Sequence, residues 1–374
     1  MLLGASLLPG VGHIALGKRS RGVRLLVYSI LMVLLVFWRW EKFLSVFQNK
    51  SIGDWVASIF LIISLAACVA FSVWDVNRLL SGTVKKAQEK SPFQLARRRF
   101  KENRLAIISL YVIVIMYIIG ILAPLLASHD PSAIDDVLET RYQSPSREHP
   151  FGTDEFGRDL LSRSLYGARV SLAVGLLAVL IAVSFGTIYG SVSGYFGGIV
   201  DNVLMRLVDV IIAFPTFYLL LMLVGIFEAS VFFLILILGF TSWTGTARFI
   251  RGELLSLKEQ QFTEAARAIG LPSRLIISRH LIPNAMSPVL VSAALMVGAM
   301  IGAEAGLSFL GIGIRPPTPS WGNMLSQGKD ALLVAWWVAF IPGALLAMTI
   351  LSFNLLADGL RDALDPKALM RRYI

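Results

Sequence analysis

The chain has 374 residues, of which 56% are apolar and only 16% are charged. Soluble globular proteins carry about 25% charged residues, and here the apolar residues come in long runs, so the composition excludes an ordinary soluble domain. The net charge is +10, but the basic residues lie between the apolar runs, where the positive-inside rule places them, which argues against nucleic-acid binding. One cysteine, Cys68, excludes an intramolecular disulfide and a cysteine-ligated metal cluster.

Eight apolar stretches approach the length that a helix needs to cross a bilayer, which is about 20 residues. The predicted fold class is therefore an all-α polytopic membrane protein. The first stretch is the shortest of the set. In chain order, the predicted spans are residues 25–40, 55–75, 105–127, 169–194, 206–226, 229–247, 285–310 and 336–357.

The charges between the spans predict the orientation. Basic residues dominate 76–104 and 248–284, whereas 128–165 is rich in acids. Because Lys and Arg concentrate in cytoplasmic loops, we expect the two basic stretches and both termini in the cytoplasm. We divide the chain into an N-terminal transmembrane hairpin at 1–80, a basic cytoplasmic linker at 81–104 and a six-span core at 105–374.

The hairpin opens with a glycine-rich motif. Pro9-Gly10-Val11-Gly12-His13, followed by Gly17-Lys18, resembles a short motif at the start of small bacterial membrane modules of unknown role, although Ala15 stands where Tyr is frequent. Packing on the core, recruitment of a partner and simple anchoring all remain open for this hairpin.

The loop at 248–284 is too polar to enter the bilayer, yet its pattern is helical. Glu259–Ile269 consists mostly of helix-forming residues, and Gly270 with Pro272 is a stop signal. We expect a second short helix from Pro272 to about Leu281, ending before Pro283. The small residues Ala265, Ala266 and Gly270 would let the surface of another protein approach the backbone. A solvated helix that merely joins two spans is the alternative.

This loop resembles the EAA loop of ABC-importer permeases. The resemblance is carried by Glu264-Ala265-Ala266, by Gly270 four residues later, and by Ile282-Pro283. His280 departs from the general pattern but matches the His-x-x-Pro-Asn variant that is frequent in the peptide branch. The resemblance implies that the loop docks on a cytoplasmic ATPase subunit.

Three further segments resemble the C-type permease subunit of dipeptide, oligopeptide and nickel importers, so that the resemblance covers about 97–367. It implies a six-span type I permease core in a bacterial or archaeal inner membrane, with a second homologous permease, two ATPase subunits and an external solute-binding protein as partners besides membrane lipid. The segments are His149-Pro150-Phe151-Gly152-Thr153-Asp154, Leu307-Ser308-Phe309-Leu310-Gly311 and Asp358-Gly359-Leu360-Arg361-Asp362.

No glycine-rich run in the chain ends in Gly-Lys-Ser or Gly-Lys-Thr, so ATP and Mg²⁺ are expected on partner subunits and not on this chain. The predicted function is thus a non-enzymatic permease subunit that imports di- or oligopeptides. The alternatives are a stand-alone secondary transporter, and the same ABC role with a nickel chelate or another small solute.

Glu304 lies late in an apolar span, and an intramembrane carboxylate costs about 2.5–3.5 kcal/mol on insertion scales. We expect it to face the bundle interior or a wet path, as part of the translocation path or gate; a structural hydrogen bond to a neighbouring helix and a position at the outer interface are the alternatives. Arg206 and Asp209 are expected to pair on one helix.

No catalytic or metal-binding residues are predicted. Asp154 and Asp159 lack further oxygen ligands at calcium-loop spacing. The four histidines show no helical metal-site spacing and are expected to make local hydrogen bonds; they are His13, His129, His149 and His280.

Overall fold

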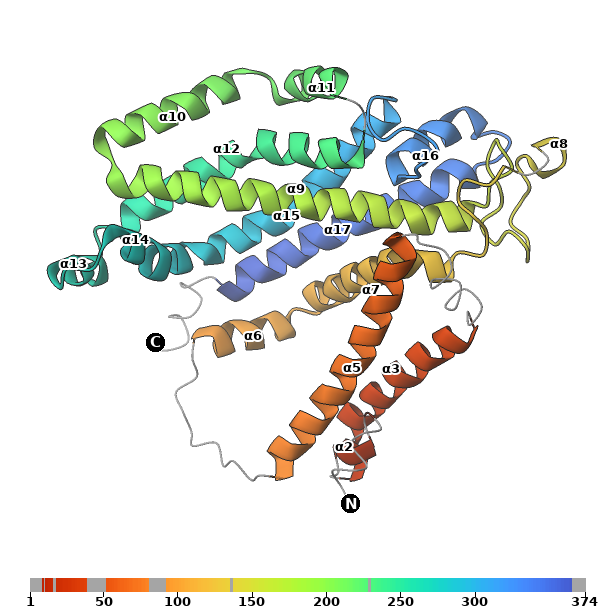
Figure 1. Cartoon of the computed structure of the whole chain (residues 1–374), viewed down its shortest axis with the longest axis horizontal. Coiled ribbons are helices and arrows are strands. Elements are labelled where there is room, and N and C mark those ends of the chain that lie inside the picture. Colours follow the sequence, from red (N-terminus) through yellow and green to blue (C-terminus); the bar gives the residue numbers. More distant parts are fainter. Residues whose placement is uncertain are drawn as a thin grey trace. The chain divides into compact units, whose positions relative to one another are not determined.

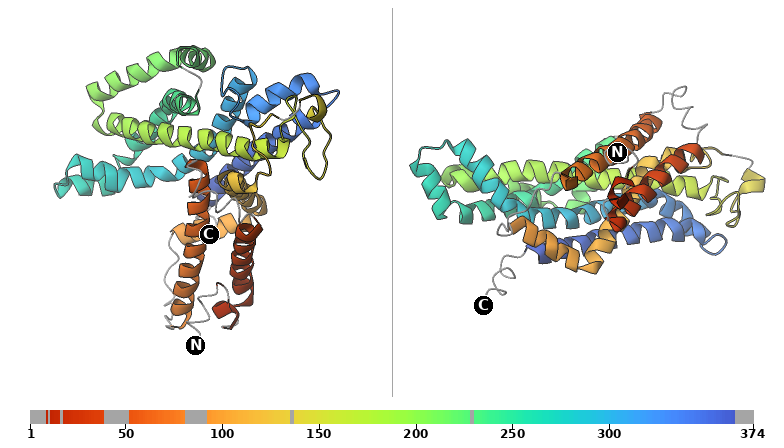
Figure 2. Two further views of the ribbon diagram at one scale, coloured as in Figure 1. Left: turned by 45° about the vertical axis from the view of Figure 1, so that its right-hand side comes forward. Right: turned by 90° about the horizontal axis from the view of Figure 1, so that it is seen from below.

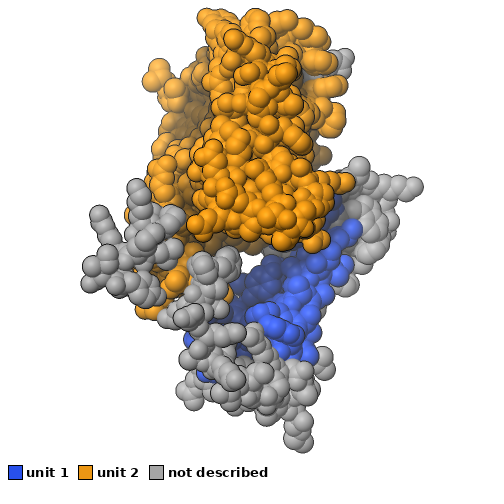
Figure 3. Space-filling view, turned by 90° about the vertical axis from the view of Figure 1, so that its left-hand side faces the viewer, with its two compact units in different colours: residues 1–90, 121–128 blue, residues 91–120, 129–374 orange. Residues whose placement is uncertain are grey.

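The computed structural model describes residues 9, 11–15, 18–38, 52–80, 92–134, 137–227 and 230–364. Across these ranges the chain is helical, with turns and one isolated bridge between Thr153 and Asp159 and no strand. It divides into two compact units (Figure 3): unit 1 comprises residues 1–90 and 121–128, and unit 2 comprises 91–120 and 129–374. The all-helical prediction is confirmed for the described residues.

Unit 1 contains α2 (Val11–Ala15), α3 (Arg19–Trp38) and α5 (Ile52–Leu80), which contact one another. A polar triad joins these three helices. His13 is fully buried and its Nε2 lies 3.0 Å from Asp75 Oδ2, to which Arg21 Nη1 donates at 2.6 Å. A charged group in an apolar hairpin needs such partners, so the triad fixes how the three helices pack.

Unit 2 forms a helical bundle. It begins with α6 and α7 and reaches α9 through a long loop that contains the short α8; we call residues 129–159 the pre-α9 loop. In chain order the helices are α6 (Pro92–Glu102), α7 (Arg104–Leu126, of which residues 104–120 belong to unit 2), α8 (Val137–Thr140), α9 (Leu160–Phe196), α10 (Gly198–Ala213), α11 (Thr216–Ile226), α12 (Val231–Leu257), α13 (Gln261–Ala268), α14 (Ser273–Leu275), the π-helix η1 (Ile276–Leu281), α15 (Ile282–Phe309), α16 (Trp321–Gly328), the 3-10 turn η2 (Lys329–Ala331) and α17 (Trp337–Leu364).

Close backbone contact holds α9 against α12. Three glycines spaced by four residues, Gly186, Gly190 and Gly194, line one side of α9. A Cβ atom at Gly186 would lie 2.7 Å from the carbonyl oxygen of Trp243, and one at Gly194 would lie 2.9 Å from that of Arg251. Small residues at this spacing allow two membrane helices to approach closely, so the sequence of α9 specifies its contact with α12.

Helix α15 is the centre of the remaining bundle. It packs against α9 on one side and α17 on the other, and α16 packs on α17. The ribbon views place α13 at one end of these long helices, whereas the pre-α9 loop and α16 lie at the opposite end (Figures 1 and 2). The two ends of unit 2 therefore present different surfaces.

The number of spans differs from the eight predicted. The described residues include six helices that are long and apolar enough to cross a membrane, or seven if the bent pair α10–α11 counts as one. The first predicted span, 25–40, corresponds to α3, whose first turns carry three arginines and which is not among the six. Residues 39–40 lie outside the described residues.

The span predicted at 206–226 is broken. Helix α10 ends at Ala213 and α11 begins at Thr216, with a bend of 83° between them. Pro215 causes the break, because a proline lacks a backbone N–H and disfavours helical geometry in the residue before it. Phe214 accordingly has an extended backbone, with φ −81° and ψ 130°.

The predicted pair of Arg206 with Asp209 is also wrong. Arg248 Nη2 on α12 donates to Asp209 Oδ1 at 2.5 Å instead. Side chains three residues apart on a helix share a face, but α12 brings a second arginine to that face.

Candidate functional site

The candidate coupling site is the elbow, residues 258–281, which joins α12 to α15. Its first helix, α13, is short and has sharply defined ends. Thr263 Oγ1 donates to the carbonyl of Leu257 at 2.9 Å, which ties α13 back to the end of α12. At the other end, Leu271 N–H donates to Ala266 O and Gly270 N–H to Arg267 O. This is the Schellman arrangement.

Gly270 ends α13 because of its backbone conformation. Its φ is +78°, in the left-handed region that glycine adopts without strain. A Cβ atom at this position would meet nothing within 4 Å, so the glycine is required by its dihedral angles and not by space. The stop predicted at Gly270 is confirmed.

One face of α13 is buried in the bundle. Thr263 and Ala266 are its buried side chains, and Ala266 is only 4% exposed. Ala266 belongs to a buried cluster that includes Leu254 of α12 and Ile276 and Leu281 of η1. Ala266 is one of the small residues that we expected to let a partner protein approach, and for this residue the expectation is wrong, because its side chain packs inward against the cluster.

The opposite face of α13 is exposed. Glu264 and Ala265 lie on it, and the two residues that follow the helix, Ile269 and Gly270, are exposed too, Ile269 to 75%. Three arginines of the elbow are exposed as well: Arg267, Arg274 and Arg279. The exposed surface of the elbow therefore combines small residues and an aliphatic side chain with charges around them.

The return leg of the elbow runs into α15 without a stop. We expected the second helix to end before Pro283, but α14, η1 and α15 form one continuous helical segment, Ser273–Phe309. The π-helix η1 accommodates the proline, because its wider turns use bonds such as Ile282 N–H to Ile277 O. Asn284 Nδ2 donates to the carbonyl of His280 at 2.7 Å.

His280 and Pro283 consequently lie on the return leg and not at the tip. The start of this leg is held to α9, since Tyr195 Oη donates to Ser273 Oγ at 3.2 Å. The guanidinium of Arg267 lies 5.3 Å from the centre of the same tyrosine ring. Tyr195 thus contacts both halves of the elbow.

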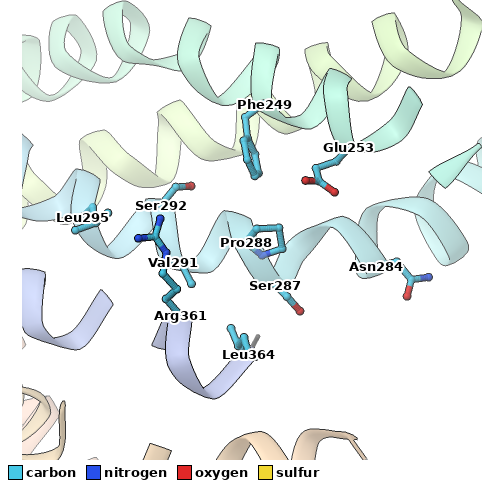
Figure 4. Close-up of a pocket in the computed structure, with 10 residues that line it drawn as sticks. All are labelled: Phe249, Glu253, Asn284, Ser287, Pro288, Val291, Ser292, Leu295, Arg361 and Leu364. Carbon is cyan, nitrogen blue, oxygen red and sulfur yellow. The ribbon is translucent and has the colours of Figure 1, made fainter. Parts of the chain in front are cut away.

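A cavity of about 570 Å³ lies between the two legs and the end of α17 (Figure 4). Phe249 and Glu253 of α12 face it from one leg, and Ser292 of α15 faces it from the other. Arg361 extends into it from α17. This space separates α12 from the start of α15, so these two helices, which lead into and out of the elbow, are not packed against each other along their whole length.

A second connection links the elbow end of α12 to α10. Arg251 binds Asp201 through two bonds, from Nε to Oδ1 and from Nη2 to Oδ2, each 2.5 Å long. Ser193 Oγ donates to the same carboxylate. Bidentate pairs of this kind fix orientation as well as distance, so α10 follows the end of α12.

Glu304 is fully buried in the bundle. Its Oε2 accepts a hydrogen bond from Ser171 of α9 and its Oε1 one from Ser308 of α15, both at 2.8 Å. Ser171 Oγ in turn accepts from the backbone of Trp321, the first residue of α16. Glu304 therefore joins three helices, and this geometry favours the structural hydrogen bond over a gate.

Comparison with known proteins identifies the family. Residues 186–370 match the family described as binding-protein-dependent transport system inner membrane component. Residues 91–145 match the N-terminal transmembrane domain of oligopeptide transport permease C. Over 282 residues the chain is 44% identical to the oligopeptide transport system permease protein OppC of Escherichia coli K12, which covers 75% of this chain and 93% of the relative. The chain belongs to this permease family.

Other relatives of the permease carry different names. The dipeptide transport system permease protein DppC of Bacillus subtilis is 40% identical over 275 residues, covering 73% of this chain and 85% of the relative. The glutathione transport system permease protein GsiD of Escherichia coli O6:K15:H31 is 39% identical over 284 residues, covering 76% and 93%. The predicted resemblance to C-type permeases is thus confirmed, and the permease is a multi-pass inner membrane protein.

The elbow and Glu304 both lie within the residues that match the family, whereas 1–90 lie outside both matches. Two contacts of this permease went unpredicted: the pair of Asp201 with Arg251, and the approach of His129 to His149. Neither has a local signal, because the first joins residues 50 positions apart on different helices. The sequence shows Asp201 in the first turn of α10, and this acid was the one local indication that a basic partner lies nearby.

Proposed function

We propose that this permease is one of two homologous membrane subunits of an ATP-driven importer of di- or oligopeptides. Two cytoplasmic ATPase subunits, which bind ATP and Mg²⁺, and an external solute-binding protein complete the complex. In this arrangement the elbow and both termini lie in the cytoplasm, and this chain forms half of the translocation path. The names of the relatives support peptides as the solute class.

The observation that carries the proposal is the exposed face of α13. Ala265 and the C-cap residue Ile269, which is 75% exposed, offer an apolar surface, and Glu264 and Arg267 border it with both signs of charge. Interfaces have this composition of an apolar centre with a polar rim. A groove on an ATPase subunit is the partner that the family resemblance implies.

The buried face of α13 explains how a push on the elbow reaches the membrane helices. Ala266 shares one buried cluster with Leu254 and Leu281, so α13 cannot move without the ends of α12 and α15. The pair of Asp201 with Arg251 extends the same motion to α10. Closure of the ATPases on ATP would thereby bias a two-state change between inward-open and outward-open forms.

Site-directed cross-linking tests the docking surface. In a Cys68→Ser background, Ala265→Cys and Ile269→Cys are expected to cross-link to co-expressed ATPase subunits within the purified complex. Two matched controls should not react: Ala266→Cys, which is buried, and Leu333→Cys, which is fully exposed at the opposite end of unit 2. Cross-linking through Leu333→Cys but not Ala265→Cys would overturn the assignment of the elbow.

Uptake into proteoliposomes that contain the reconstituted importer tests the solute. We expect ATP-dependent uptake of a labelled dipeptide or pentapeptide in the presence of the solute-binding protein. Uptake without ATPase subunits would indicate a secondary transporter. Uptake of a nickel chelate but of neither peptide would contradict the peptide assignment while leaving the importer role intact.

A further inference from the structure

Three potential metal ligands meet in the pre-α9 loop of unit 2. His129, Glu148 and His149 each offer one ligand atom, and these atoms lie within 4.8 Å of one another. The two imidazole rings are close neighbours, with centroids 4.8 Å apart and planes tilted by 35°. The fold therefore brings together two histidines that are 20 positions apart in the chain.

Asp159 lies behind both rings. His149 Nδ1 is 3.0 Å from Asp159 Oδ1, and the carboxylate is itself buried, with 1% of its side chain exposed. Metal-binding histidines usually donate the N–H of their second ring nitrogen to a carboxylate, a backbone carbonyl or a water, which fixes the tautomer and orients the ring. Asp159 is in that position, and it leaves Nε2 of His149 free to accept a metal ion.

His129 has an unsatisfied nitrogen at the same place. Its Nδ1 is buried and has no hydrogen-bond partner, and Asp159 Oδ2 at 3.8 Å is beyond hydrogen-bond distance. Buried polar atoms almost always have a partner, and an exception calls for an explanation such as an ion. Local hydrogen bonding, which the sequence predicted for this histidine, does not account for this nitrogen.

The backbone fixes the two histidines before any ion binds. His129 N–H donates to Ser162 Oγ at 3.2 Å, and His149 N–H donates to Ser146 Oγ at 3.0 Å. The carbonyl of His149 accepts from the amides of Ser146 and Gly152, each at 2.8 Å. Glu148 is exposed, so its side chain is the part of the group with room to adjust.

The neighbouring acid does not belong to this group. Asp154 accepts from Arg158 Nε at 2.8 Å and lies 3.3 Å from Arg163 Nε, and its other oxygen accepts two backbone amides. It is therefore already neutralised within the loop. The candidate ligands are two imidazoles and one carboxylate.

We propose that His129, Glu148 and His149 form a binding site for a divalent first-row transition ion, with Asp159 orienting His149. Two imidazoles and a carboxylate suit Zn²⁺, Ni²⁺ or Cu²⁺ better than Mg²⁺ or Ca²⁺, which prefer oxygen ligands. Zinc–ligand bonds of about 2.0–2.2 Å place tetrahedral ligand atoms roughly 3.4 Å apart, so atoms that now lie up to 4.8 Å apart must approach by at most about 1.4 Å, which a movement of the exposed Glu148 side chain can supply.

Zinc binding to the full-length permease in detergent tests the site, with Zn²⁺ alone as the probe and an affinity tag without histidines. Competition with a chromophoric chelator should show one Zn²⁺ per chain for the wild type. Glu148→Gln should weaken binding at least tenfold, and His129→Ala should abolish it. Both variants alter partly or fully exposed side chains, so the fold is expected to persist. His280→Ala, which removes an imidazole at the opposite end of unit 2, is the matched control and should bind as the wild type does.

Asp159→Asn measures the orienting role separately. Loss of such a carboxylate typically costs 10–100-fold in metal affinity, and the asparagine can still cap α9. A rise in the unfolding temperature on adding Zn²⁺ should appear for the wild type and His280→Ala and disappear for His129→Ala. Absence of stoichiometric zinc binding to the wild type, or binding that neither Glu148→Gln nor His129→Ala weakens, would overturn the proposal.

Discussion

The two ends of unit 2 treat their charged residues in opposite ways. In the pre-α9 loop and the first turn of α9, Asp154, Arg158, Asp159 and Arg163 are all less than 5% exposed and bind one another or nearby backbone. In the elbow, Glu264, Arg274 and Arg279 are exposed. These four residues of the first end neutralise one another and hold the loop in a fixed shape, whereas the named residues of the elbow leave their charges available to a partner protein.

The largest expected loss of stability comes from breaking the buried ion pairs of the pre-α9 loop and the first turn of α9. Asp154→Ala would leave Arg158 and Arg163, which are 4% and 0% exposed, without their carboxylate. Removing one partner of a buried ion pair costs about 3–5 kcal/mol. Denaturant unfolding of the purified permease should show this loss, and the exposed acid Glu139, changed to Ala, should not. A stability loss no larger than that of Glu139→Ala would contradict the comparison.

Glu304 gives the next effect. Glu304→Leu leaves the buried hydroxyls of Ser171 and Ser308 without an acceptor, at a cost of about 1–3 kcal/mol. Glu304→Gln keeps one acceptor oxygen, so we expect transport to stay within about twofold of the wild type. Uptake assays distinguish a structural role of Glu304 from a role in the gate. A Glu304→Gln protein that is stable but does not transport would assign Glu304 to the gate.

A matched pair on α13 tests the exposed end. Ala265→Asp places a charge on the exposed face and should lower peptide uptake at least tenfold, about 1.4 kcal/mol, while stability changes by less than about 0.5 kcal/mol. Ala266→Asp places the same charge in the buried cluster, where an unpaired carboxylate is costly, so it should lower stability instead. Equal effects of the two variants on stability would show that the face of Ala265 is not free.

The smallest effect is expected at the exposed pair of Arg248 with Asp209. Both side chains are about half exposed, at 48% and 50%. Such pairs contribute at most about 1 kcal/mol, so Arg248→Ala should change the free energy of unfolding by less than about 0.5 kcal/mol in physiological salt. A loss as large as that of Asp154→Ala would remove the distinction between buried and exposed pairs.

Much of the fold was predictable because long apolar runs have few structural alternatives in a membrane protein. The runs that became α7, α9, α12, α15 and α17 and the stop at Gly270 follow from hydrophobicity and from one backbone rule. The break at Pro215 was visible in the sequence, yet the apolar run around it suggested a single span. The backbone restriction at Pro215 predicts a break there, whereas the average hydropathy of 206–226 predicts one continuous span. The structure shows the break.

The side-chain partners were not predictable in the same way. The orientation of Ala266 depends on where Leu254 and Leu281 lie, and a helix of eight residues carries too little pattern to fix its own face. The approach of His129 to His149 depends on the path of the pre-α9 loop. Contacts of this kind come from tertiary packing, which no local sequence window contains.

Helix α9 has a mechanical consequence. It is 37 residues long, about 55 Å at 1.5 Å per residue, and its glycines lock it to α12 beside the elbow. At its other end the N-cap residue Asp159, which accepts from Ser162 N–H, joins it to the pre-α9 loop. Helix α9 can thus act as a rigid strut, and a displacement of a few ångströms imposed at one side of the bilayer would reappear at the other without any rearrangement in between.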